Sequence, residues 1–180
     1  MKKILLSLLF ILLSKTIIAQ SFHAELKANG LTCAMCSYST QRSLEKLDFI
    51  KSITPDLEAT SFKLEFKEDM FIDFDLIQQK VEDAGFFVGK IDIIFDEVIS
   101  AVNDKHTFIE NNLFHIFSDK ELESNLFSLV DKNFISKKKF NLISEKTTHS
   151  CFLTGKYTEN CCSHHDKIKS DRVFHLKTDL

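Results

Sequence analysis

The stretch GLTCAMC at residues 30–36 decides the fold of the first half of the chain, because it separates two hydrophobic patterns. Before it, residues 24–28 alternate between apolar and polar side chains, which predicts a half-buried strand. After it, Tyr38, Leu44 and Leu47 suit one face of a helix over about residues 36–48. The two cysteines are therefore expected on the loop and first helical turn, where the unpaired amides of a helix start favour thiolates.

The segments that follow complete a recognisable order of elements. Strands are predicted near residues 50–57 and 62–66, joined as a hairpin, and again over residues 87–95. Between the last two lies a helix that is capped by Asp73 and closed by Gly85. The order βαββαβ is the ferredoxin-like arrangement, an α+β fold. Pro55 falls in the second strand, which lies at a sheet edge in this fold, and edges are where proline is tolerated.

Cys33 and Cys36 are the residues with the clearest chemistry. Two thiolates three residues apart can hold one soft metal ion such as copper(I) or zinc. A thiol–disulfide oxidoreductase site and a structural disulfide are the alternatives. Oxidoreductases of the thioredoxin type usually carry Trp and Pro around the pair, but this chain has no Trp and its one proline is Pro55. The residues around the pair thus favour metal binding.

The same stretch resembles the Gly-Met-Thr-Cys-x-x-Cys loop of heavy-metal-associated domains, a family that includes copper chaperones and periplasmic mercury-binding proteins. The resemblance covers residues 22–95. It implies that Cys33 and Cys36 bind copper(I), or mercury(II) in the mercury branch. Leu31 replaces the family's methionine, so we expect Leu31 to pack beneath the loop. Phe86 matches an aromatic that the family often places near the loop, and it is either a cover for the metal or a core side chain.

The first 20 residues have the pattern of a secretory signal peptide. Two lysines precede an apolar run over residues 4–13, and the segment ends at Ala19-Gln20. The apolar run is short for a membrane span of about 20 residues. We therefore expect an exported protein, periplasmic or secreted, without a stable membrane anchor after cleavage.

Composition limits the partners of this chain. It has 180 residues, of which 44% are hydrophobic and 27% charged, as in an ordinary globular protein. Without the lysines of the first 20 residues, 20 Lys and Arg face 26 Asp and Glu, so the net charge is about −6. This charge does not suit nucleic acid. The partners expected are a metal ion and a metal transporter or efflux protein.

The second half of the chain resembles no family on its residues. We interpret residues 96–105 as a linker and residues 106–180 as a small β-rich domain. An Asn111-Asn112 step could turn a hairpin, residues 126–135 and 140–143 are β-prone, and residues 172–177 suggest a final strand. The histidines at positions 23, 106, 115 and 175 suit ordinary surface or strand positions, and no role is assigned to them.

A second group of metal-ligand types lies near the end of the chain. Cys161, Cys162, His164 and His165 fall within five residues, shortly after His149 and Cys151. All are residue types that bind zinc or copper. The alternative is a disulfide from Cys151 to one of the pair, although five cysteines leave one over in any scheme of disulfides alone.

The sequence thus predicts an exported binding protein, not an enzyme, that transfers copper(I) through Cys33 and Cys36. A mercury(II) scavenger of the same fold is a close variant, and zinc is a further possible ion. A thiol–disulfide oxidoreductase that uses Cys33 and Cys36 is the rival of a different class. A non-catalytic module that docks on a transporter, with purely structural cysteines, is the other.

Overall fold

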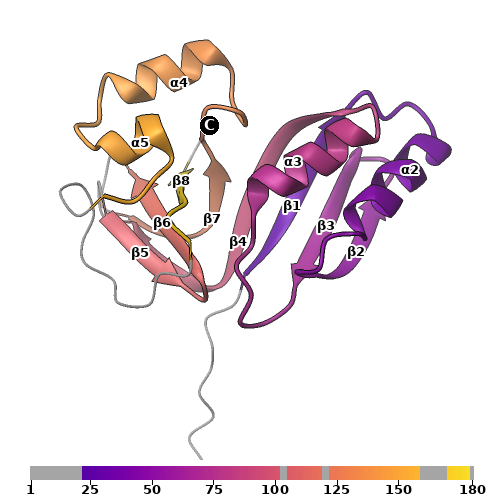
Figure 1. Ribbon diagram of the computed structural model, residues 1–180, viewed down its shortest axis with the longest axis horizontal. Coiled ribbons are helices and arrows are strands. Elements are labelled where there is room, and N and C mark those ends of the chain that lie inside the picture. The colour runs from indigo at the N-terminus through magenta and orange to yellow at the C-terminus, as the bar shows by residue number, and fades with distance from the viewer. Residues whose placement is uncertain (1–21, 102–104, 119–121, 159–169, 179–180) are drawn as a thin grey trace, which may run out of the picture.

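The computed structural model of the chain describes residues 22–101, 105–118, 122–158 and 170–178. Its first half has the predicted βαββαβ order, with α2 and α3 on one face of the sheet (Figure 1). Strands β1, β2, β3 and β4 pair antiparallel in the order β2-β3-β1-β4. The elements are β1 (Phe22–Asn29), α2 (Ala34–Leu44), β2 (Ile50–Asp56), β3 (Ser61–Phe66), α3 (Phe74–Asp83) and β4 (Phe87–Ala101).

Two local predictions are confirmed by this arrangement. Pro55 lies in β2, the strand at one end of the sheet. An edge strand has no partner on one side, so proline, which has no amide hydrogen to donate, is tolerated there. Asp73 is the N-cap of α3 and accepts hydrogen bonds from the amides of Asp75 and Leu76. Both features were visible in the sequence because they depend on local chemistry.

The buried face of α2 differs from the prediction. Tyr38 is 56% exposed, and the helix ends at Leu44, so that the buried Leu47 follows it. The face turned to the core consists instead of Ser37, Thr40, Ser43 and Leu44. Burying this polar face is acceptable where the side chains bond within the helix, as when the Thr40 hydroxyl donates to the Cys36 carbonyl at 3.1 Å.

The second half of the chain extends the same sheet. The order of strands is β2-β3-β1-β4-β7-β8-β6-β5, with β6 and β8 parallel. Two helices cover this part, drawn in orange in Figure 1. The elements are β5 (Lys105–Ile109), β6 (Asn112–Phe117), β7 (Leu122–Leu129), α4 (Lys137–Ser144), α5 (Ser150–Thr154) and β8 (Val173–Lys177).

This architecture corrects the prediction of a linker followed by a separate β-rich domain. Residues 96–101 continue β4, which pairs with β1 along its first part and with β7 on its other side. A hairpin and the final strand are confirmed, but the hairpin turns at Glu110-Asn111 because Asn112 already pairs with Ile109, and residues 140–143 lie in α4. That helix begins where the Ser136 side chain accepts from the amide of Lys139, a cap that outweighs the β-prone residues behind it.

One hydrophobic core runs under both halves. Phe22 of β1 meets Phe114 of β6 with ring centroids 5.6 Å apart, and Phe74 of α3 meets Phe174 of β8 at 4.9 Å. The buried side chain of Asn112 bonds both the amide and the carbonyl of Ile72, at 3.0 and 2.7 Å. Because these contacts join residues of both halves, the two halves pack as one body.

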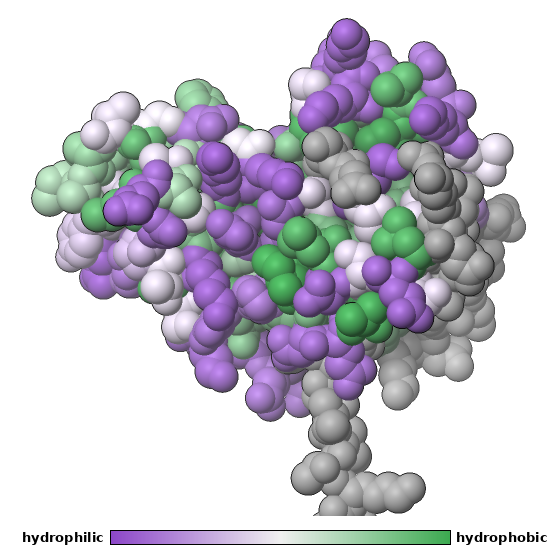
Figure 2. Space-filling model, turned by 180° about the vertical axis from the view of Figure 1, so that it is seen from behind, coloured by the Kyte–Doolittle hydropathy of each residue, from purple (hydrophilic) through white to green (hydrophobic). Residues whose placement is uncertain are grey.

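The surface shown in Figure 2, the side opposite to Figure 1, is largely hydrophilic with a small hydrophobic area near its middle. Charged side chains such as Glu25, Lys63 and Asp92 alternate with buried residues along the strands β1, β3 and β4. Among the helices in the described ranges, none has both the length and the apolar character needed to cross a membrane.

Candidate metal centre

The Cys33–Cys36 pair lies at the connection between β1 and α2, as predicted. Cys33 is the N-cap of the helix, with extended backbone, and its Sγ accepts a hydrogen bond from the Cys36 amide at 3.2 Å. Cys36 lies in the first helical turn. Amide hydrogens at a helix start favour negative charge, so this position stabilises the Cys33 thiolate when the pair is reduced.

The two cysteines form a disulfide in this structure, with their Cα atoms 5.2 Å apart. The pair is therefore seen in its oxidised form, in which neither sulfur is a thiolate ligand. Their chemistry still fits a soft metal ion, because reduction yields two thiols three residues apart at the start of one helix. The disulfide also fits the alternative redox and structural roles, so it does not by itself decide between them.

The two sulfurs differ in their surroundings. Cys33 is exposed, whereas Cys36 is half-buried and packs against the core. Leu31, just before them, is 8% exposed and belongs to the core, which confirms that it packs beneath the loop. The loop is thus anchored through Leu31 and Cys36 and leaves Cys33 accessible.

Gly30 and Phe86 meet at the base of the loop. Gly30 has a φ of +91°, a conformation that L side chains rarely adopt, and a Cβ there would lie 3.4 Å from Cδ1 of Phe86. Phe86 is half-buried and packs against the core, next to the start of the loop. Phe86 therefore packs as a core side chain beneath the loop, which is one of the two roles predicted for it.

Two apolar side chains of α2 are exposed beside the pair. Met35, between the cysteines, is 72% exposed, and Tyr38 is 56% exposed. Neither contributes to the core of the domain. Both side chains therefore belong to the solvent-exposed surface of α2 beside Cys33 and Cys36.

The predicted second group, Cys161, Cys162, His164 and His165, lies outside the described residues. The structure instead brings together histidines to which the sequence gave no role. His106 of β5 pairs with His115 of β6, and His115 pairs with His175 of β8, so three imidazoles stand in a row across adjacent strands. His115 and His175 are fully buried, and His106 is 9% exposed.

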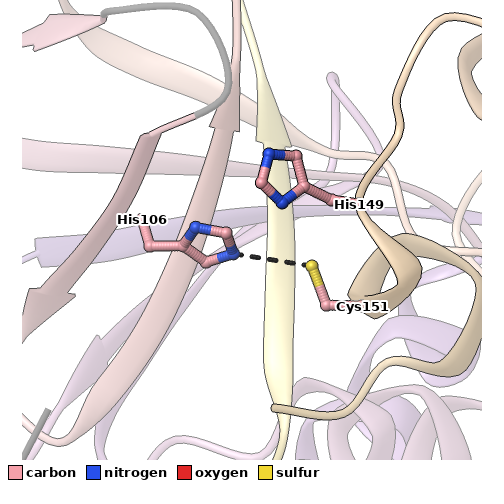
Figure 3. Close-up of side chains that lie close together, drawn as sticks. All are labelled: His106, His149 and Cys151. Carbon is pink, nitrogen blue, oxygen red and sulfur yellow. Dashed lines mark hydrogen bonds between the residues drawn. The ribbon is translucent and has the colours of Figure 1, made fainter. Parts of the chain in front are cut away.

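The thiol of Cys151 lies against this row. Its Sγ is 3.5 Å from Nε2 of His106 and 3.4 Å from Nδ1 of His115. Cys151 is fully buried on α5, and His149 lies just before that helix, so both reach the row from the covering helix (Figure 3). We call the residues His106, His115, His149, Cys151 and His175 the Cys/His cluster.

Asp131 fixes the orientation of His175. Its carboxylate accepts from the ring Nδ1 of His175 at 2.9 Å and from the His175 amide at 2.8 Å. Arg172 donates to the same carboxylate at 2.9 Å and to Asp75 of α3 at 2.7 Å. Although burial raises the pKa of Asp131, the neighbouring His175 and Arg172 lower it below its usual value overall, so the carboxylate is charged near neutral pH.

The imidazole of His115 is uncharged at neutral pH. The pKa of His115 is lowered to about 2, mainly by burial and in addition by the neighbouring imidazoles of His106, His175 and His149. A neutral imidazole has one nitrogen that can accept a hydrogen bond or bind a metal ion. His115 therefore presents a neutral nitrogen donor 3.4 Å from the Cys151 thiol.

The comparison with known proteins concerns only the first half of the chain. No curated protein matches the sequence. Among similar solved structures, the CopZ metallochaperone is 21% identical, with a TM-score of 0.34 over 37% of this chain and 97% of that chain. A copper binding domain from HMA7, a P-type ATPase, is 24% identical, with a TM-score of 0.34 over 37% of this chain and 89% of that one.

A third similar structure is the yeast copper transporter domain CCC2A, which is 20% identical, with a TM-score of 0.34 over 38% of this chain and 92% of that one. The match that identifies the segment is to a family, the heavy-metal-associated domain, at residues 25–87. These residues include β1 from Glu25 onward, the Cys33–Cys36 pair, α2, β2, β3, α3 and the first residue of β4. Residues 25–87, about a third of the chain, are therefore a heavy-metal-associated domain.

Proposed function

We propose that the chain binds copper(I) through the reduced Cys33–Cys36 pair and transfers it to a partner by thiolate exchange. The observation that supports this best is the placement of Cys33 as the exposed N-cap of α2 within a heavy-metal-associated domain. Thiolate ligands select soft ions, and a pair of them suits the low coordination of copper(I). Mercury(II) suits the same two sulfurs, and zinc is a weaker fit.

Binding begins with reduction of the disulfide. A dithiol reductant supplies two electrons and two protons, the S–S bond breaks, and the reductant leaves as its own disulfide. Each thiol then loses its proton as its sulfur binds the metal. The amide of Cys36 that donates to Cys33 Sγ stabilises the thiolate formed first.

Transfer follows from the unequal exposure of the sulfurs. A thiolate of the partner attacks the metal on the side of the exposed Cys33, which leaves first, while Cys36 remains held on the helix. The metal then passes through a mixed-ligand state and is never released to water. No bond other than metal–sulfur bonds is made or broken in this exchange, so we expect no catalysis.

The partner in this proposal is a metal transporter or efflux protein with its own thiolates. The exposed side chains of Met35 and Tyr38 give it an apolar surface to cover beside the pair. The signal-peptide pattern of residues 1–20 would place the exchange outside the cytoplasm, in the periplasm or beyond.

A second candidate function is thiol–disulfide exchange, for which the disulfide between Cys33 and Cys36 would be the oxidised form of the site. In this function the Cys33 thiolate attacks a substrate disulfide and Cys36 resolves the mixed disulfide. It predicts catalysed reduction of a test disulfide and a mixed disulfide that accumulates in Cys36→Ser.

The deciding experiment is a competition titration of the reduced full chain, under anaerobic conditions, against a chromogenic copper(I) chelator. We expect one tight site that Cys33→Ser abolishes. Met35→Leu, a change between the two cysteines that keeps both sulfurs, should leave the affinity within a few-fold. Retained tight binding in Cys33→Ser would remove the assignment, and elemental analysis of the chain purified without added metal gives an independent reading.

A further inference from the structure

The Cys/His cluster lies outside the heavy-metal-associated domain, in the second half of the chain. The ligand atoms of His115, Cys151 and His175 all lie within 4.8 Å of one another, and all three residues are fully buried. They come from β6, α5 and β8. Three such side chains converge from separate elements, so the grouping is a product of the tertiary structure.

The sulfur–nitrogen distance in the cluster, which a thiol–imidazole hydrogen bond accounts for in this structure, also fits two ligands of one metal ion. A zinc ion about 2.3 Å from sulfur and about 2.0–2.1 Å from nitrogen, with tetrahedral angles, keeps those two atoms about 3.5 Å apart. The Sγ of Cys151 lies 3.4 Å from Nδ1 of His115. The ligands are therefore spaced as one edge of a coordination polyhedron.

His175 supplies the second, independent observation. Its Nε2 is buried and, within the described residues, makes no hydrogen bond. Its other nitrogen, Nδ1, is held by Asp131 at 2.9 Å, which fixes the ring and leaves Nε2 with an unused lone pair. An unsatisfied buried polar atom costs about 1–3 kcal/mol. A ligand that binds Nε2 removes this cost.

The Asp131–His175 pair also matches a known device of metal sites. Histidines that bind metal ions usually donate their other ring nitrogen to a carboxylate, which sets the tautomer and raises the basicity of the ligating nitrogen. Asp131 is itself fixed by Arg172, at 2.9 Å. The imidazole of His175 is thus held rigidly in the same cluster as the Cys151 thiol and the His115 imidazole.

We propose that Cys151, His115 and His175 bind a single zinc(II)-class transition metal ion in the buried part of the second half of the chain. One thiolate and two imidazoles form a borderline ligand set, which suits zinc(II) and its analogue cobalt(II) better than the softer copper(I). Three protein ligands leave the fourth tetrahedral position to water or a further donor, and burial of the ligands opposes exchange of the bound ion. This site is independent of the copper(I) proposal, since it shares no residue with the Cys33–Cys36 loop.

Cobalt(II) is the probe of choice, because a thiolate bound to it gives a charge-transfer absorption. The full chain carrying serine at Cys33, Cys36, Cys161 and Cys162 keeps Cys151 as its one thiol. We expect this variant to bind one equivalent of cobalt(II) with that absorption, and zinc(II) to displace it. Adding Cys151→Ser should abolish the absorption.

The ligand set is tested by histidine variants in the same background. His115→Gln and His175→Gln should weaken cobalt(II) binding by at least about 100-fold, and Asp131→Asn by about 10- to 100-fold. His23→Gln, in the first half of the chain, is the matched control and should leave binding unchanged. Loss of binding in His149→Gln without loss in His175→Gln would overturn this ligand set in favour of Cys151 with His106 and His149.

Two results would overturn the proposal as a whole. One is a folded Cys151-only variant, by circular dichroism, that shows no thiolate–cobalt absorption. The other is an absorption that survives Cys151→Ser. If the Cys151-only variant does not fold, the same two readings are taken from Cys33→Ser/Cys36→Ser with and without Cys151→Ser, where equal absorption would reject the site.

Discussion

Asp131 accepts two hydrogen bonds from His175, one from the ring Nδ1 at 2.9 Å and one from the backbone amide at 2.8 Å. The same carboxylate binds the guanidinium of Arg172 at 2.9 Å. Asp131 is 4% exposed, so its charge is stabilised by these partners instead of by water. The pair joins the loop after β7 to the last strand, far apart in sequence, and fixes one wall of the Cys/His cluster.

Asp131→Asn should destabilise the metal-free protein by about 3 kcal/mol, because it leaves a largely buried arginine without one of its counter-charges. Asp75→Asn is the matched control. It removes the other carboxylate that binds the guanidinium of Arg172. Because the Asp75 side chain is 41% exposed, the loss should cost less than about 1 kcal/mol. Urea unfolding of the two variants compares them directly, and equal losses would show that burial does not set the strength of the Asp131 contact.

Asn112→Ala tests the contact between the two halves of the chain. The change leaves the buried amide and carbonyl of Ile72 without the partners they have at 3.0 and 2.7 Å, at a cost of about 1–3 kcal/mol each. Asn111→Ala, at the half-buried neighbouring position, should cost less than about 1 kcal/mol. Thermal unfolding should remain a single transition at a lower temperature. Two transitions in Asn112→Ala would show that the halves unfold separately.

Glu110→Gln should stabilise the protein at neutral pH. Burial raises the pKa of Glu110 above its ordinary value of 4.5, and nearby Asp69, Glu68 and Asp96 add to the effect. For a carboxyl with a raised folded-state pKa, the penalty is absent below pH 4.5 and grows as pH rises through the folded pKa. We expect a gain within about 1 kcal/mol at pH 7, since water screens half-exposed charges.

The measurement for Glu110→Gln is the difference in unfolding free energy from the parent protein at pH 7 and at pH 4. The difference should shrink towards zero at the lower pH. Glu58→Gln, at an exposed glutamate in the turn after β2, is the control and should change the free energy of unfolding by less than about 0.5 kcal/mol. A gain that is the same at both pH values would mean that charge on Glu110 is not its cause.

Cys33 should react faster than Cys36 with iodoacetamide in the reduced protein. Cys33 is exposed and its sulfur accepts an amide hydrogen at the helix start, whereas Cys36 is half-buried against the core. We expect several-fold more label on Cys33 at short times, measured by mass spectrometry of the digested chain. Faster labelling of Cys36 would contradict the order of ligand exchange proposed for copper(I).

Much of the first half of the chain could be predicted because local chemistry determines it. The alternation of residues 24–28, the cap at Asp73 and the proline at an edge strand each act within a few residues. The buried face of α2 could not be read in the same way. Small polar residues such as Ser37 and Thr40 can be buried, because a hydroxyl can bond within the helix, as that of Thr40 does. The prediction that Tyr38 belongs to the buried face was therefore wrong.

The sequence by itself determined the metal-associated loop, since the spacing of Cys33 and Cys36 needs no distant partner to place both sulfurs on one helix start. Only the tertiary structure decided that both halves share one sheet and that His106, His115 and His175 stand in register across three strands. The reason is physical. Strand register is fixed by pairing between residues far apart in the chain, and no local pattern records which histidine will face which.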